Sequence, residues 1–553
     1  MLIALKDHPL LQPRGDLDTS VYIALAKQLP AKAFFVSPLY LYFLRALGVS
    51  LRAARIVQIV LGSLAVVLIF DTARRWFDDR AATIGAILAI LTGVISFYEV
   101  TILQAALDPL LVALTLWALT LALQSGSLRM FALTGAALGL LVLNRPNALL
   151  WVPLLAAGVL RLRGWRNALV LAVAVFVPIM PVSIRNYAVS HQFVLIASHG
   201  GLNFYIGNNA AADGTYHHVP GIRPTIAGQE DDTLRVAALA MHRNSVSAEE
   251  ASSYFYDQAW GWIRSNAGAA FVLFLRKIAY TFNRTDLALN YSYSFFQHDT
   301  RSPLLLLFVG PWLLFPLGLA GAAGRLRDRQ FALWATFVPL YAISVAIFFV
   351  SSRYRLPLLI PMCITAGSMF VRPRLWTWIV AVVIAIAVCW NLGLDDGRAH
   401  ERTNMVVYLI ENHRFDDAAQ WVAATGAMTR DPATLYIRSA LAYGAAGAPE
   451  RELPMIQQLE AVPHAPEEGS EAAQMARELG AGFVKSERPE LALAAFGAAH
   501  QLEPGDASDL LNIAVLQAQA GNINAARENA RAALRLRPAY PQAEGLLRAL
   551  EGP

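Results

Sequence analysis

Long apolar runs, most of them free of charged residues, recur along the first 392 residues of the chain. Most are about 14 to 23 residues long, close to the length that a helix needs to cross a lipid bilayer. The pattern therefore predicts an all-α, polytopic transmembrane helical bundle. The ten predicted spans are residues 54–71, 81–98, 103–123, 130–143, 147–160, 167–182, 302–323, 331–350, 356–371 and 375–392.

The pattern changes after residue 392, where shorter amphipathic segments follow one another. Three residue pairs in this tail are separated by 34 residues, the period of tetratricopeptide repeats; they are Ala492 and Ala526, Leu502 and Leu536, and Pro504 and Pro538. A weaker unit at 415–432 brings the expected total to three or four repeats. We predict an α-solenoid over 393–553 beside a membrane domain over 1–392. A helical tail that only caps the membrane domain is the alternative.

Composition and charge exclude several classes of protein. The chain is 56% hydrophobic and 15% charged, unlike a soluble enzyme or a disordered chain. Its basic excess lies in 1–392, with 31 Lys and Arg against 18 Asp and Glu, whereas 393–553 carries 14 against 22. The positive charges flank apolar runs, which favours a membrane over a nucleic acid as partner. Cys363 and Cys389 both lie inside apolar runs, so neither a disulfide framework nor a cysteine zinc site is expected.

Arginine distribution predicts the orientation in the membrane. Alternate short connections between spans hold twelve arginines, and the opposite connections hold only Arg145, Arg353 and Arg355. The positive-inside rule places the twelve-arginine side in the cytoplasm, so 1–53, 183–301 and the tail face outward. Because no span precedes this outward N-terminal segment, we expect a first span upstream of Met1. A cytoplasmic N-terminus, the alternative, would invert the whole assignment.

Two outward-facing segments carry candidate acids. Within 13–44 an amphipathic helix on the membrane surface is predicted, with Asp16 and Asp18 at its start, because apolar residues recur at helical spacing: Leu17, Val21, Ala24, Leu25 and Leu29. Carboxylates there either cap the helix or accept a proton from a bound hydroxyl. Glu99 lies in a short outer connection, where an ionised group is costly unless it is used or hydrated. Asp108 lies just inside the next apolar run, so we expect its carboxylate to cap that helix.

Several stretches in this order resemble bacterial family 39 glycosyltransferases of the GT-C superfamily, which includes protein O-mannosyltransferases and lipid A aminoarabinose transferases. They include LDTSVYIALAKQL, AFFVSPLYLYFLRALG, FYEVTILQAAL, LGLLVLNRPNALL, HGGLNFYIGNN and SSRYRLPLLIPM. The resemblance covers nearly all of residues 8–372. It implies transfer of a sugar from a polyprenyl-phosphate donor to an outward-facing acceptor that is a glycan, a lipid or a protein.

The resemblance also implies site residues. The family places an acid four residues before a tyrosine as the catalytic base, which gives Asp18 with Tyr22, holds Asp16 in reserve and adds Glu99 as a second acid. One base suffices for a single inverting displacement, because a phosphate leaving group needs little acid help. Residues expected to bind the lipid phosphate or donor are Arg353, Tyr354, Arg355, Arg145, Lys277 and Arg185.

The outer loop 183–301 supplies the other expected contacts. Its Gly- and Asn-rich segment 199–209 suits tight turns beside a sugar, and Asn203 and Asn208 join Tyr22 as the substrate-binding candidates. His217 and His218 lack further ligands at zinc spacing. Where the family often has NxxE, this chain has Asn283 and Asp286 in NRTD. No cofactor is assigned, and a divalent metal is left open.

The expected location is the bacterial inner membrane, with the active site and the repeats on the periplasmic side. Two other functions stay open: a noncatalytic membrane scaffold that recruits envelope proteins through its repeats, and a lipid or glycan transporter. A transporter would need ionisable residues in mid-membrane, whereas the charges here gather at one interface. Neither the sugar nor the acceptor follows from the sequence.

Overall fold

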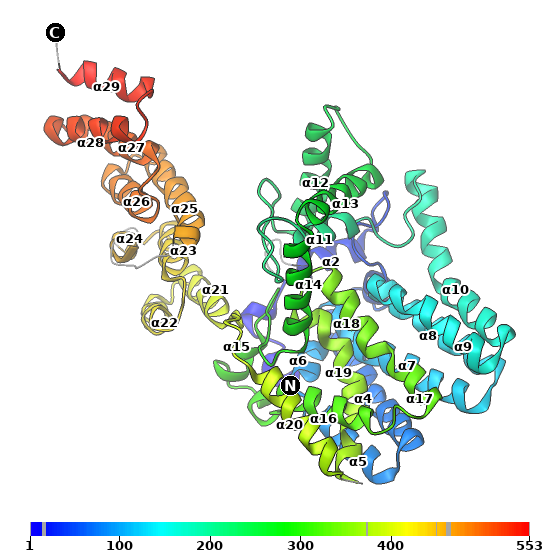
Figure 1. The fold of residues 1–553 in the computed structure, drawn as a ribbon. Helices are drawn as coiled ribbons and strands as arrows, with labels where there is room; N and C mark the ends of the chain where they lie inside the picture. The colour runs from blue at the N-terminus through cyan, green and yellow to red at the C-terminus, as the bar shows by residue number, and fades with distance from the viewer. Residues whose placement is uncertain (1, 14–17, 372–373, 449–450, 460–465, 552–553) are drawn as a thin grey trace. The chain divides into compact units, whose positions relative to one another are not determined.

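The computed structural model describes residues 2–13, 18–371, 374–448, 451–459 and 466–551, and these residues form helices and loops without a named strand (Figure 1). The prediction of an all-α chain is therefore confirmed. The chain divides into two compact units, Met1–Gly397 and Arg398–Pro553.

In the first unit, helices cover most of each predicted span, and non-helical residues interrupt the spans 81–98 and 302–323. Four helices are long and apolar enough to cross a membrane, namely Leu51–Trp76, Gln104–Ser125, Trp165–Ser190 and Arg329–Ile347. The bounds along the predicted spans are α4 Leu51–Trp76, α5 Asp79–Ile90, α6 Gly93–Val100, α7 Asp108–Ser125, α8 Leu128–Asn144, α9 Trp151–Arg163, α10 Trp165–Ser190, α16 Pro311–Ala323, α17 Arg329–Ala335, α18 Phe337–Ile347, α19 Ser352–Ala366 and α20 Leu375–Cys389. These apolar helices form a bundle and indicate a membrane protein.

Two glycines set a close helix contact in the bundle. α8 carries Gly135 and Gly139 four residues apart, and both face α10. A Cβ atom at Gly135 would lie 2.4 Å from the Leu171 carbonyl oxygen, and one at Gly139 would lie 2.2 Å from the Val175 carbonyl oxygen. Small residues at this spacing let two membrane helices approach until their backbones touch. Packing between α8 and α10 therefore depends on both glycines.

Five helices form most of the loop between α10 and α16. They are α11 Gly200–Gly207, α12 Ile226–Ala240, α13 Ala248–Ser265, α14 Ala267–Phe282 and α15 Tyr293–His298. α13 begins with a capping box, in which Ser247 and Glu250 satisfy each other's backbone N–H groups. α11 lies directly on α13, since a Cβ atom at Gly201 would fall 2.0 Å from the Ser252 carbonyl oxygen.

The N-terminal segment differs from its prediction. In place of one amphipathic helix over 13–44, the structure has α2 Asp18–Lys27 and α3 Leu39–Ala46, preceded by the short α1 Leu2–Leu5. α2 buries Thr19, Tyr22 and Ala26, while Ala24 of the predicted apolar face is exposed. The reason is that the hydroxyls of Thr19 and Tyr22 have hydrogen-bond partners inside the protein. Leu17 and Asp16 lie outside the described residues.

The second unit is a stack of helix pairs, drawn from yellow to red in Figure 1. Its helices are α21 Arg398–Glu411, α22 Phe415–Gly426, α23 Pro432–Ala445, α24 Glu452–Leu459, α25 Pro466–Lys485, α26 Pro489–Leu502, α27 Ala507–Gln519, α28 Ile523–Leu536 and α29 Pro541–Glu551. α26 and α28 begin at 489 and 523, which keeps the 34-residue period. Ala492 and Ala526 are both fully buried, so the repeated small residues pack the pairs. The predicted α-solenoid is confirmed.

Candidate active site

An ion pair joins the two ends of the first unit's sequence. The Arg353 Nη1 atom donates to Asp18 Oδ2 at 2.8 Å, although 335 residues separate them. Asp18 is the first residue of α2 and Arg353 is the second of α19. Their side chains are 15% and 12% exposed. The pair is thus largely enclosed, yet a ligand can still reach it.

The segment after α14 fixes both partners of this pair. Arg353 Nη1 also donates to the Asn290 side-chain oxygen. The next residue, Tyr291, shares a hydrogen bond of 2.8 Å with Thr19 Oγ1, and Thr19 also donates to the Ile102 carbonyl at 3.3 Å. α2, the 290–291 segment and the start of α19 are therefore held together around the Asp18 carboxylate.

A second buried ion pair lies beside the first. Asp108 Oδ2 accepts from Arg145 Nη2 at 2.7 Å and from Nε at 2.9 Å, and both residues are almost completely buried. Asn144 donates to Asp108 Oδ1 at 2.7 Å. Arg145 Nη2 also donates to the Arg353 carbonyl at 3.1 Å, which links the two pairs. Asp108, expected from sequence to cap its helix, is the counter-ion that orients Arg145.

The Tyr354 ring is the shared neighbour of both guanidinium groups. The Arg353 Cζ atom lies 5.1 Å from the ring centroid and the Arg145 Cζ atom lies 5.2 Å from it. Arg145 Nη1 and Arg353 Nε are buried without a hydrogen-bond partner among the described residues. Buried donors of this kind are costly unless a ligand or water accepts their protons. Two guanidinium donors are therefore available to an anion at this place.

Two aromatic side chains flank the Asp18 carboxylate. Tyr22, one turn after Asp18, is buried and donates to Gln104 Oε1 at 3.4 Å. Burial, together with the negative charge of Asp18, raises the pKa of Tyr22, so its hydroxyl stays protonated. The His199 ring lies over Phe35 with centroids 4.3 Å apart. Burial lowers the pKa of His199 to about 4, against the opposing effect of Asp18, so the imidazole is neutral near pH 7.

His199 and Asn290 are residues beside the ion pair that the sequence analysis did not name. His199 lies close enough to Asp18 for their charges to interact. It opens the HGGLNFYIGNN segment, which had been singled out for its glycines and asparagines alone. Its Nε2 atom is buried and has no hydrogen-bond partner in the described part of the chain. A histidine directly before a glycine pair, in the long 183–301 loop, was the available signal.

Two arginines that were predicted to bind the sugar donor instead form hydrogen bonds to backbone carbonyls. Arg355 Nη1 donates to the carbonyl of Asn283 at 2.6 Å, and Nη2 donates to that of Thr285. Arg185 Nη1 donates to the Lys32 carbonyl at 2.9 Å, and its guanidinium lies 4.0 Å from the Phe34 ring centroid. The structure does not bring these two into the Asp18–Arg353 cluster, because their donors brace loops.

Lys277 and Asn208 form a separate buried contact. Lys277 Nζ donates to Asn208 Oδ1 at 3.1 Å, and Asn208 Nδ2 donates to the Ile347 carbonyl at 2.8 Å. Lys277 is 1% exposed, and burial lowers its pKa to about 7. Asn203, on the neighbouring α11, is half-buried. These contacts join α14 and α11 to the end of α18.

The remaining predicted acids lie apart from the pair. The Glu99 carboxylate packs against α4, where a Cβ atom at Gly62 would fall 1.9 Å from its Oε1. Asp286 Oδ2 accepts from the Tyr293 backbone N–H at 3.0 Å, and burial raises its pKa although Ser352 and Arg355 oppose this. Among the described residues, no group of three or more His, Cys, Asp or Glu side chains is placed to hold a metal ion.

An apolar groove of about 340 Å³ opens near this cluster. It runs between α3, α4, α7 and α8, and Leu107 in its wall directly precedes Asp108. The residues that line it are Leu39, Tyr42, Phe43, Leu61, Leu107, Leu110, Leu111 and Leu140.

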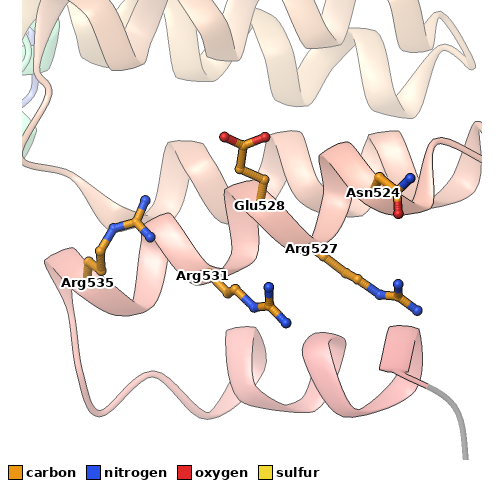
Figure 2. A pocket seen from close by; sticks show the side chains of 5 residues that line it. All are labelled: Asn524, Arg527, Glu528, Arg531 and Arg535. Atoms are coloured by element: carbon orange, nitrogen blue, oxygen red, sulfur yellow. The ribbon is translucent and has the colours of Figure 1, made fainter.

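A hollow of about 440 Å³ lies on α28 in the second unit (Figure 2). Arg527 and Arg531 point from α28 toward α29, where Arg527 donates to the Leu550 carbonyl and Arg531 pairs with Glu551 at 2.8 Å. These arginines hold the last helix, and none of the predicted catalytic residues lines the hollow.

Residues 32–184 match the family described as dolichyl-phosphate-mannose-protein mannosyltransferase. The match supports a membrane glycosyltransferase. The matched segment contains Glu99, Asp108 and Arg145, whereas Asp18 and Arg353 lie outside it. No curated protein matches the chain.

Solved structures with similarity to the chain include two of an archaeal enzyme. The Archaeoglobus fulgidus oligosaccharyltransferase tethered to an acceptor peptide is 14% identical over 74% of this chain, with a TM-score of 0.35. Its AglB complex with an inhibitory peptide and a dolichol-phosphate is 15% identical over 74%, with a TM-score of 0.34. The chain spans 55% and 56% of their lengths. The Cut9–Hcn1 assembly is 13% identical over 85% of this chain, with a TM-score of 0.20.

Proposed function

We propose that this protein is a polyprenyl-phosphate-sugar-dependent glycosyltransferase, related to the bacterial family 39 enzymes, that transfers a sugar to an outward-facing acceptor. The observation that carries the proposal is the Asp18 carboxylate, held beside Arg353 and next to a second guanidinium, Arg145. A base and two phosphate-binding groups are what sugar transfer from a lipid phosphate needs.

The proposed reaction is a single displacement. The acceptor oxygen attacks the anomeric carbon, its proton passes to Asp18, and the bond from that carbon to the phosphate oxygen breaks. The products are the glycosylated acceptor with inverted configuration and a polyprenyl phosphate. Arg353 and Arg145 stabilise the negative charge that grows on the departing phosphate, since guanidinium groups bind phosphate oxygens in pairs.

Lipid character of the donor is supported by the groove beside the cluster. Its lining is made of leucine and aromatic side chains, and it leads from α3 and α4 toward Leu107, next to the Asp108–Arg145 pair. An isoprenoid chain in this groove would place its phosphate near Arg145. Tyr22, Asn203 and Asn208 stay our candidates for contacts with the sugar or acceptor.

We place the reaction on the outer face of the bacterial inner membrane. The arginine distribution supports this orientation, because the connections on the other side carry most of the positive charge. The repeat unit would lie on the same outer side, where it would bind an acceptor protein or another envelope enzyme. Stacked helix pairs provide an extended surface for such contacts.

The test compares lipid-linked sugars and envelope glycans by mass spectrometry in cells that lack the protein. Wild type should consume the carrier-linked sugar and restore a glycan, whereas Asp18→Asn should restore none. Asp7→Asn is the matched control, since Asp7 is exposed and lies in the same N-terminal segment. Full restoration by Asp18→Asn would refute the assignment of the base, and unchanged glycans on deletion would refute sugar transfer.

A further inference from the structure

The cluster at the candidate site is balanced in charge without any ligand. Arg145 and Arg353 face Asp108 and Asp18, two positive groups against two negative ones. A sugar-phosphate donor linked to a lipid adds another negative charge. The Arg145 Nη1 and Arg353 Nε groups, which have no partner among the described residues, can meet this anion first, and full neutralisation of its charge follows when one carboxylate gives up its arginine.

The two ion pairs differ in how firmly they are held. Asp108 is 0% exposed and accepts from two nitrogens of Arg145 and from Asn144. Asp18 is 15% exposed and meets Arg353 through Nη1. Removing the partner of a fully buried carboxylate costs several kcal/mol, whereas a partly exposed carboxylate regains water. Asp18, and not Asp108, is therefore the carboxylate that loses its arginine partner when the donor binds.

Arg353 keeps its place when Asp18 leaves. Its Nη1 atom also donates to Asn290, its Nη2 atom donates to the Tyr354 hydroxyl at 3.2 Å, and its guanidinium lies against the Tyr354 ring. Its Nε atom is buried with no partner among the described residues. The guanidinium is thus positioned independently of Asp18 and can accept a phosphate in exchange for the carboxylate.

We infer that the Asp18–Arg353 ion pair is a closed resting state, which the donor phosphate opens by taking Arg353 and releasing the Asp18 carboxylate to the acceptor. The inference rests on the proposed function and adds an order of binding to it. Donor comes first, because Asp18 cannot deprotonate an acceptor while Arg353 holds it. An acceptor that binds without the donor meets an Asp18 that is still paired with Arg353, so its proton is not removed unproductively.

The test measures binding of a polyprenyl monophosphate, the leaving group of the proposed reaction, to the full-length protein in nanodiscs. Asp18→Asn should bind it about three- to tenfold more tightly than wild type, because the competing carboxylate is gone. Arg353→Gln should bind it at least tenfold more weakly. Asp7→Asn controls for the change in net charge and should bind like wild type.

A second readout follows the Asp18 carboxylate itself. Difference infrared spectra on adding the polyprenyl monophosphate should show a shifted carboxylate band in wild type that is missing in Asp18→Asn. Equal affinity of wild type and Asp18→Asn, or an unchanged carboxylate band, would overturn the exchange and leave the proposed function standing. If no folded variant binds the lipid phosphate, the proposed donor site itself falls, and the exchange with it.

Discussion

Thr19 and Tyr291 share a hydrogen bond of 2.8 Å across 272 residues of sequence, one residue away from Asp18 and Asn290 respectively. Each of the two side chains therefore adjoins a residue that contacts Arg353. This link sets the distance between α2 and the segment after α14, and so the position of the carboxylate.

Replacing the Tyr291 hydroxyl should weaken catalysis more than folding. Tyr291→Phe removes the hydrogen bond to Thr19, worth about 1 kcal/mol, so we expect kcat to fall about three- to tenfold. KM for the lipid donor should change little, since Arg353 is untouched. Steady-state kinetics and melting temperature give the comparison. Tyr187→Phe, on an exposed tyrosine of α10, is the control; an equal loss there would contradict the proposed link.

Arg353 should not tolerate lysine. A lysine offers a point charge without the planar fork that contacts Asp18, Asn290 and Tyr354 together. We expect Arg353→Lys to lower kcat/KM about 100-fold while the protein stays folded. The same assay on Arg264→Lys, an exposed arginine of α13, should give wild-type rates. Wild-type activity of Arg353→Lys would remove the guanidinium from the mechanism.

Substituting Asp108 should mainly lower stability, whereas substituting Asp18 should mainly abolish activity. Asp108→Asn leaves the buried Arg145 without its counter-ion, so we expect a loss of about 3 to 5 kcal/mol in unfolding free energy. Asp18→Asn should cost less stability than Asp108→Asn, because Asp18 is 15% exposed and Arg353 keeps its contacts with Asn290 and Tyr354, and it should abolish transfer. Thermal unfolding in detergent measures both. Comparable destabilisation by the two variants would show that the pairs play the same structural part.

Lys277 should make stability depend on pH. Burial lowers its pKa from 10.5 to about 7, so between these values the unfolded chain binds more protons than the folded protein. Stability therefore rises with pH across that window, and it falls progressively as pH drops from 10.5 to about 7, below which both states hold the proton and the effect levels off. Lys277→Met should reduce the difference in melting temperature between pH 7 and pH 9. An unchanged difference would mean that Lys277 stays charged in the fold.

Periodicity was enough to predict the helices, since apolar runs and a 34-residue repeat report directly on which surfaces are buried. It failed for 13–44, where α2 turns Thr19 and Tyr22 inward because their hydroxyls find partners on segments distant in sequence. Amphipathic spacing scores such residues as outward-facing. Only the folded chain supplies the acceptors that reverse this.

The candidate site was predicted in part. Asp18 was named from the family resemblance, and Arg353 and Arg145 from positive charge at the predicted outer boundary of the membrane; the structure brings these three together. Arg355 and Arg185 carry the same signal, yet they donate to backbone carbonyls. Sequence reports that an arginine is present at the interface, and it does not report which acceptors lie within reach. His199 and Asn290 escaped because neutral polar side chains in loops have no comparable cost.

The distance in sequence between Asp18 and Arg353 has a consequence for the protein's synthesis. A ribosome that adds about 5 to 20 residues per second needs roughly 17 to 70 seconds to pass from one residue to the other. α2 and most of the predicted spans are made before that interval ends, while the arginine that completes the pair does not yet exist. Under the proposed function, the nascent chain therefore carries Asp18 and Arg145 before it has Arg353, and the proposed transfer can begin only after α19 has been made.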